Sequence, residues 1–106
     1  SGGSMSITHT TCKQTARSLR IWIEGDKLSA AGFPPDTPYS TCYDVKRRQI
    51  RLDFEPTSKK RVTKSTRNGK PRPIIDLSNK SVGTVFDAGD ALQVRFSTNR
   101  IIIERA

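Results

Sequence analysis

Basic side chains gather between residues 57 and 72, and their chemistry is the binding of anions. Seven lysines and arginines fall in these sixteen residues without any acidic residue: Lys59, Lys60, Arg61, Lys64, Arg67, Lys70 and Arg72. The whole chain has 19 Lys and Arg against 10 Asp and Glu, a net charge of +9, so the other residues together carry only +2. Because no acid offsets these cations, the segment predicts a phosphate-binding surface; the alternative is a solvated connection between structured parts.

A second set of basic residues lies in the first half of the chain, in a polar turn and at the entrance to that half: Lys46, Arg47 and Arg48, with Arg17 and Arg20. Placed beside residues 57–72, they would form a basic stripe that holds phosphates by counterion release without reading sequence. Trp22, Tyr39 and Tyr43 could stack on bases. The alternation around Trp22 instead favours a place at the edge of the core.

The sequence offers few groups for catalysis or metal binding. Its one histidine, His9, lies in a polar segment that we expect to be a mobile tail. Its two cysteines, Cys12 and Cys42, form no CxxC pair, and we expect both to be reduced thiols. The carboxylates of Glu24 and Asp26 are separated by a glycine in a turn-like pattern, which disfavours a catalytic pair. The sequence therefore predicts no enzyme, no metal site and no cofactor.

Alternating apolar residues predict short strands on both sides of the basic segment. Before the basic segment, the expected strands are residues 19–23, a stretch that ends at residue 43, and residues 50–54. After the basic segment, they are residues 74–77, 92–96 and 101–103. The connectors at 28–33 and 81–86 have room for one short helix each. Each half is therefore strand, short helix, strand, turn and strand, so that the two halves resemble each other as repeats.

Neither repeat can cover its own apolar face, because three strands of about five residues do not enclose a core. The expected faces are Ile21, Ile23, Leu52 and Phe54 in the first repeat and Leu92, Val94, Phe96 and Ile102 in the second. We therefore predict a mostly β protein in which both repeats share one pseudosymmetric barrel or sandwich. The expected boundaries are 1–16 for a tag remnant and flexible N-terminal tail, 17–56 for the first repeat, 57–72 for a basic linker and 73–106 for the second repeat.

The second repeat resembles the AbrB/MazE swapped-hairpin fold. The resemblance lies in residues 82–86, in Ala88-Gly89-Asp90 with the alternation that follows it, and in the apolar strand 101–103. The first repeat is similar to the SymE toxin family through Gly25-Asp26-Lys27-Leu28 and Ala31-Gly32-Phe33. These resemblances imply a swapped-hairpin barrel with one short helix per repeat and with basic residues that contact DNA. One chain would build it as a monomer, or two chains would exchange halves as a homodimer.

These observations predict a small cytoplasmic protein that binds nucleic acid, DNA or RNA. The leading interpretation is a DNA-binding regulator or antitoxin-like factor that contacts phosphates through the basic linker. Two alternatives stay open: a protein-binding inhibitor from a mobile genetic element, whose basic loop holds an acidic partner, and a SymE-like toxin that acts on RNA or the nucleoid. We expect no membrane partner, because no segment approaches the ~20 apolar residues of a spanning helix.

Overall fold

Strands dominate this computed structural model, which describes residues 6–67 and 69–106. In chain order the elements are β1 (Ser6–Thr11), β2 (Lys13–Gln14), β3 (Leu19–Glu24), α1 (Asp26–Ala30), β4 (Tyr39–Asp44), β5 (Gln49–Phe54), β6 (Thr63–Arg67), β7 (Lys70–Ser78), α2 (Val82–Val85), β8 (Ala91–Ser97) and β9 (Arg100–Arg105). The predicted mostly β class is confirmed, and each predicted repeat contains one short helix.

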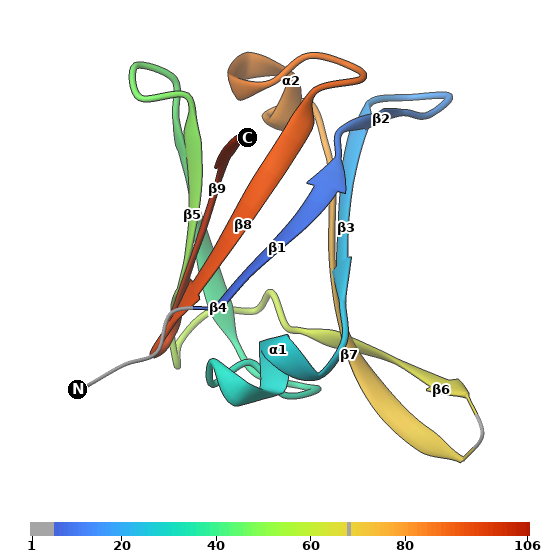
Figure 1. Cartoon of the computed structure of the whole chain (residues 1–106). Coiled ribbons are helices and arrows are strands. Elements are labelled where there is room, and N and C mark those ends of the chain that lie inside the picture. Colours follow the sequence, from blue (N-terminus) through green and yellow to red (C-terminus); the bar gives the residue numbers. More distant parts are fainter. Residues whose placement is uncertain (1–5, 68) are drawn as a thin grey trace.

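The strands form two antiparallel sheets that face each other (Figure 1). The five-stranded sheet has the order β1-β8-β9-β5-β4, and the four-stranded sheet has the order β2-β3-β7-β6. Each repeat therefore places its first strand in the four-stranded sheet and its hairpin in the five-stranded sheet. Neither sheet closes on itself, so the two remain separate layers.

Equivalent strands of the two repeats pair with each other, β3 with β7 and β5 with β9. In both pairs the first core residue of one strand lies opposite the second core residue of the other: Ile21 opposite Leu77, Ile23 opposite Ile75, Ile50 opposite Ile103 and Leu52 opposite Ile101. This crosswise register is the one that a local two-fold axis between the repeats would produce. The similarity of the two halves in sequence is thus matched by the way their strands meet.

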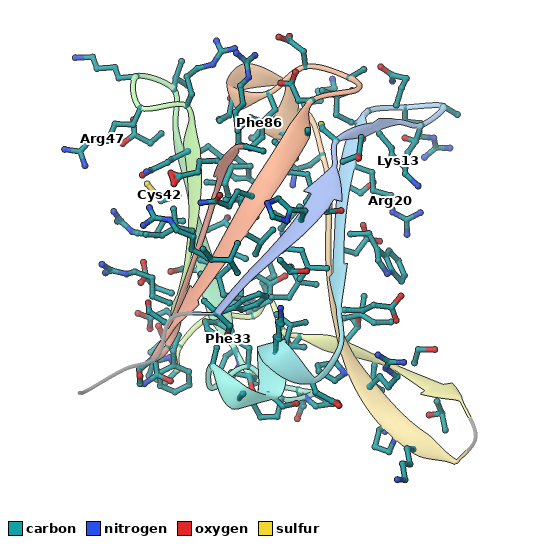
Figure 2. The ribbon with its side chains drawn as sticks, in the orientation of Figure 1. Lys13, Arg20, Phe33, Cys42, Arg47 and Phe86 are labelled. Carbon is teal, nitrogen blue, oxygen red and sulfur yellow. The ribbon has the colours of Figure 1, made fainter. Side chains whose placement is uncertain are left out.

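The core fills the space between the sheets, and a helix lies at each end of it. Phe33, which follows α1, and Phe86, which ends α2, are both buried and lie at opposite ends of the molecule (Figure 2). The expected inward faces are confirmed except at two positions. Phe54 is 43% exposed, and β9 turns Ile101 and Ile103 inward while Ile102 is only half-buried. Strand alternation explains the second difference, because adjacent residues of a strand point to opposite faces.

The expected N-terminal tail is wrong for the described residues from Ser6 onward. β1 pairs with β8 over its whole length, from Ser6 opposite Phe96 to Thr11 opposite Ala91, and β2 pairs with β3. Cys12 between them is fully buried, and its backbone bonds the loop before β8 through Gly89 and Asp90. The inward residues of β1 are serine and threonine rather than aliphatic, so β1 gives no apolar alternation in the sequence.

Part of the expected linker, residues 57–72, forms regular strand structure. Residues 63–67 form β6, which pairs with the first half of β7 as a hairpin that projects beyond the two sheets (Figure 1). Residues 60–62 run beside 36–39, where the amide of Val62 donates to the carbonyl oxygen of Thr37 at 2.9 Å. The hairpin projects into solvent, so it has no need of an apolar stripe from which its strands could have been predicted. Asn68, half of the predicted turn dipeptide, lies outside the described residues.

Gly32 lets the end of α1 touch the turn between β8 and β9. Its φ is +96°, and a Cβ at this position would collide with Oδ1 of Asn99. The amide of Asn99 donates to the carbonyl oxygen of Ala31 at 2.8 Å, and the amide of Phe54 donates to the carbonyl oxygen of Asn99 at 3.1 Å. This close approach joins the two repeats through their backbones.

We expect Gly32→Ala to lower the free energy of unfolding by about 1–3 kcal/mol, because it combines positive-φ strain with a collision. Chemical denaturation measures the change. Gly89→Ala isolates the strain, since its φ is +89° and no atom lies within 4 Å of an added Cβ, and it should cost less. Gly83→Ala has 3.8 Å of clearance from Leu19 and an ordinary φ, and it should not destabilise. Equal losses for Gly32→Ala and Gly89→Ala would show that the collision is relieved.

We also expect that neither repeat folds alone. Fragments 6–67 and 69–106 separate β3 from β7 and β5 from β9, and each loses core side chains whose burial contributes about 1.5–3 kcal/mol apiece. Circular dichroism should show little strand content in either fragment and its recovery on mixing. Dispersed amide resonances from a monomeric 69–106 fragment would contradict this expectation.

Candidate nucleic-acid interface

The β6–β7 hairpin carries predicted cations away from the rest of the protein. Lys64 lies on β6, Lys70 and Arg72 lie on β7, and all three are exposed. Among the described side chains, no carboxylate lies within 4 Å of them. The register places Arg72 beside Ser65 on one face and Lys64 beside Pro73 on the other. Arg67 is the last residue of β6, and its side chain is outside the described part.

The hairpin is poorly suited to pairing with another strand. β6 is the outer strand of the four-stranded sheet, and an outer strand normally offers unpaired amides to a neighbour. Here β6 carries Lys64, and the first half of β7 contains Pro71 and Pro73, which have no amide hydrogen to donate. Charge and proline are features that protect sheet edges from pairing. The hairpin therefore exposes its cations without offering an edge for pairing with a further strand.

Three more predicted cations lie in the segment that leads into the hairpin. Lys59 and Lys60 are exposed, and no described acid lies within 4 Å of either. Arg61 is partly neutralised, because its Nη1 donates to the carbonyl oxygen of Asp36 at 3.0 Å and lies 3.9 Å from the Asp36 carboxylate. This segment and the hairpin are continuous in the chain, so their cations form one group.

The second predicted group lies at the other end of the molecule. Lys46, Arg47 and Arg48 occupy the β4–β5 turn, and Arg17 lies in the β2–β3 turn, both at the end opposite the hairpin (Figures 1 and 2). The expected single stripe is therefore wrong. Two of these arginines also face acids: Arg47 lies 3.8 Å from Asp44, and Arg48 lies 3.8 Å from Asp87.

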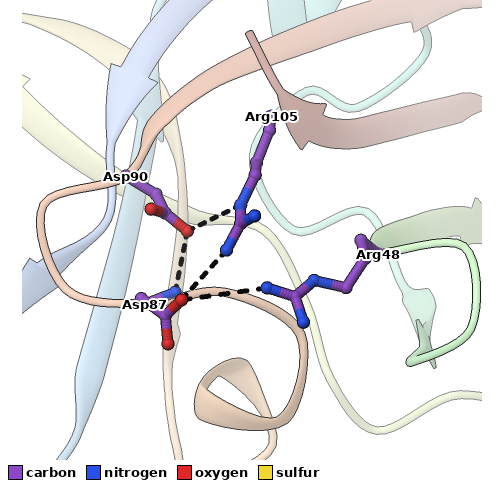
Figure 3. A network of polar contacts seen from close by, with 4 residues as sticks. All are labelled: Arg48, Asp87, Asp90 and Arg105. Atoms are coloured by element: carbon purple, nitrogen blue, oxygen red, sulfur yellow. Dashed lines mark hydrogen bonds and ion pairs between the residues drawn. The ribbon is translucent and has the colours of Figure 1, made fainter.

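Arg48 belongs to a network that fixes the loop before β8 (Figure 3). Arg105 donates from Nε to Asp90 at 3.0 Å and from Nη2 to Asp87 at 2.9 Å. The amide of Asp87 donates to Oδ2 of Asp90 at 2.8 Å, and this hydrogen bond is the largest influence that holds the pKa of Asp90 below its ordinary value of 3.8. These arginines bind the protein's own carboxylates, which gives the cluster a structural role.

The lowered pKa of Asp90 predicts a loss of stability in acid. A carboxylate whose pKa is lowered in the folded state stabilises the fold at pH values above its unfolded-state pKa. This stabilisation is lost as the pH falls through the lower pKa of the folded state. We expect Asp90→Asn to be less stable than the parent protein at neutral pH, by under about 1 kcal/mol for so exposed a network. Urea unfolding should show this difference disappear below pH 3.8.

Asp36→Asn is the control, since the Asp36 side chain is 85% exposed and its one ion pair among the described residues, with Arg61, spans 3.9 Å. It should leave the pH dependence unchanged. A difference between Asp90→Asn and the parent that persists unaltered into acid would contradict the assigned role of the Asp90 charge.

Arg20 lies on the outward face of the four-stranded sheet. It donates from Nε and Nη2 to the two carboxylate oxygens of Asp76, at 2.9 and 2.8 Å. Its Cζ lies 4.6 Å from the ring centroid of Trp22, and Nε1 of Trp22 donates to Glu24 at 3.1 Å. The hydrogen bonds to Asp76 raise the pKa of Arg20 beyond its usual range, so the guanidinium stays charged. Arg20 is thus held in place between the Asp76 carboxylate and the Trp22 indole.

Of the three aromatic residues predicted to contact bases, Trp22 is the accessible one. It is 38% exposed and points outward on β3, whereas its neighbours Ile21 and Ile23 point into the core. Tyr39 is buried, and burial is the main cause that raises its pKa to about 12. Tyr43 packs against the core, and its hydroxyl accepts a hydrogen bond from Asn79 at 3.0 Å. The alternation in the sequence favoured a place for Trp22 at the edge of the core, and it did not predict the outward ring or its contact with Arg20.

The described ranges contain no cluster of three or more His, Cys, Asp or Glu side chains that could hold a metal ion. Both cysteines are free, Cys12 buried and Cys42 exposed, and burial is the main cause that raises the pKa of the Cys12 thiol. His9 lies on β1 opposite Gln93 rather than in a tail.

Comparison of the chain with models of protein families, with curated proteins and with solved structures gave no match. The resemblance to the AbrB/MazE and SymE families therefore stays a prediction. Among the described residues, neither helix combines the length and the apolar character that crossing a membrane requires.

Proposed function

We propose that this protein binds nucleic acid, with DNA as the leading partner, through the phosphates. The observation that carries the proposal is the β6–β7 hairpin, which projects from the sheets with Lys64, Lys70 and Arg72 exposed and unopposed by described acids. Two-stranded ribbons are among the elements that enter a DNA groove. Lys59 and Lys60 extend the same cationic group along the chain.

The contrast between the two ends of the molecule supports this location. At the end with the β4–β5 turn, Arg47, Arg48 and Arg105 already bind carboxylates of the protein. A cation held by an internal carboxylate has less attraction left for a phosphate. At the hairpin end no such competition exists among the described residues for Lys64 and Lys70. Phosphates are therefore expected to concentrate at the hairpin.

We further propose that the fold is a single-chain form of the swapped-hairpin arrangement. The pairing of β3 with β7 and of β5 with β9 supports this proposal, because equivalent strands of the two repeats meet in crosswise register. Each repeat also divides its strands between the two sheets, as an exchange of hairpins requires. A regulator or antitoxin-like role is the function that such a fold and a phosphate-binding arm would serve.

Titration of duplex DNA across a series of salt concentrations tests the function. Each neutralised phosphate contributes about −0.9 to the slope of log affinity against log salt concentration. The double substitution Lys64→Ala with Lys70→Ala should weaken binding to all sequences alike and make the slope shallower by about 2. Duplex RNA in the same titration distinguishes the SymE-like alternative, which predicts tighter binding to RNA.

Lys46→Ala with Lys80→Ala is the matched control, since it removes the same charge from exposed residues far from the hairpin tip. It should leave the slope nearly unchanged. Equal effects of the two double substitutions would place the binding surface elsewhere. Absence of binding to either duplex at low salt would refute the function and favour an acidic protein as the partner.

A further inference from the structure

A cavity lies between β1 and β3, the two strands along which the sheets approach each other. β1 is the edge strand of its sheet, and β3 pairs with β2 only at Leu19 and Arg20. The hydroxyl of Thr10 crosses the gap and donates to the carbonyl oxygen of Trp22 at 3.2 Å. The cavity beside this bridge has a volume of about 410 Å³ and is lined by Thr10, Thr11, Lys13, Arg20 and Trp22. This is the size range of pockets for small organic groups.

Trp22 in the wall of this cavity is fixed before any ligand arrives. Arg20 covers part of its ring, Asp76 holds Arg20 by two hydrogen bonds, and Glu24 accepts from the indole nitrogen. The ring therefore cannot swing freely, although it is 38% exposed. An aromatic surface held in place gives up little conformational entropy when a flat ligand stacks on it.

The cavity is cationic. Lys13 is exposed, and no acid of the described residues lies within 4 Å of it. Arg20 adds a second positive charge, which its ion pair with Asp76 at 2.8 Å partly offsets. Of the residues that the structure describes, no carboxylate lines this cavity. Glu24 lines a smaller cavity of about 180 Å³, which shares Thr10 and Trp22 with it. The cavity thus joins a flat aromatic surface to a free cation, which suits a planar group attached to an anion.

We propose that this cavity binds one base of a single-stranded nucleic acid, which stacks against Trp22 and Arg20 while the adjoining phosphate contacts Lys13. The proposal rests on the proposed function, because it extends nucleic-acid binding across the same sheet. Arg72, Asp76, Arg20 and Trp22 share the outward face of the four-stranded sheet, since Trp22 lies opposite Asp76 and residues 72 and 76 alternate in phase along β7.

A peptide strand is the less suitable occupant. It would have to add to β1 or β3 along the gap, but the Thr10 hydroxyl already joins the two strands at Trp22. Lys27 also reaches across from α1, and its Nζ donates to the carbonyl oxygen of Ile7 on β1 at 2.8 Å. An added strand would need to lie about 4.8 Å from its neighbour for backbone pairing, and these two hydrogen bonds already span the gap in which it would lie. A base needs only the space beside the bridge.

Trp22 is the only tryptophan in the chain, so a change in tryptophan fluorescence reports on the surroundings of this one side chain. The probes are a short oligothymidylate and an abasic oligonucleotide with the same number of phosphates. We expect the oligothymidylate to quench Trp22 and to bind more tightly than the abasic probe at the same salt concentration. Equal binding and equal quenching by the two probes would overturn the proposal, because phosphate attraction alone would then explain both.

Trp22→Leu should weaken oligothymidylate binding about 5- to 150-fold, the range for loss of one base–aromatic stack, and leave the abasic probe unaffected. Trp22→Phe retains a ring and should restore most of the affinity, measured by anisotropy of a labelled probe. Circular dichroism checks that both variants fold, as expected for an outward side chain. An unchanged affinity of Trp22→Leu, or equal competition by an acidic peptide, would also overturn the proposal.

Lys13→Ala should weaken both probes, since it removes the phosphate contact rather than the stack. The outcomes for this cavity and for the hairpin are separable. Duplex binding with no preference for oligothymidylate over the abasic probe would refute the base site alone. Quenching by oligothymidylate without duplex binding would refute the hairpin proposal alone.

Discussion

Everything in this fold depends on the pairing of β3 with β7 and of β5 with β9. Each repeat has an apolar face that its own three strands leave uncovered, and these two ladders bring the opposite repeat over it. Because each repeat divides its strands between the sheets, separating the repeats would open both layers at once. The contact of Gly32 with Asn99 adds to an arrangement that those two ladders already determine. The ion pairs of Arg105 with Asp87 and Asp90 do the same.

The same arrangement distributes the charge. The carboxylates Asp44, Asp87 and Asp90 lie where the repeats meet at one end, and they neutralise the arginines around them. The hairpin stands outside the contact between repeats, so Lys64 and Lys70 have no carboxylate of the described residues within 4 Å. The excess positive charge of this +9 chain is therefore concentrated at the hairpin, because the fold pairs arginines with carboxylates at the opposite end of the molecule. Arg20 is intermediate between these two cases, because it lies on an outward face beside Trp22 but its charge is partly offset by Asp76.

Sequence patterns predicted the elements whose residues alternate between core and solvent. Leu92, Val94 and Phe96 are all inward, as their spacing indicates, and a short helix follows the first strand of each repeat. β1 escaped prediction because Ser6, Thr8 and Thr10 occupy its inward positions, and β6 because it projects into solvent. The stacking of Arg20 on Trp22 joins neighbours on one strand through Asp76 of another, 56 residues away, and no local pattern encodes that distance.

β7 runs without interruption from the tip of the hairpin into the centre of the four-stranded sheet. Its first residues, Lys70 to Arg72, are exposed and carry two positive charges, and its later residues, Ile75 and Leu77, are fully buried. The hairpin is therefore not a hinged appendage: the strand that carries its exposed cations continues as the strand that lies in the core. A force applied at the tip of the β6–β7 hairpin is transmitted along β7 into the apolar interior. The hairpin is therefore anchored in the close-packed part of the protein, which is the hardest to deform.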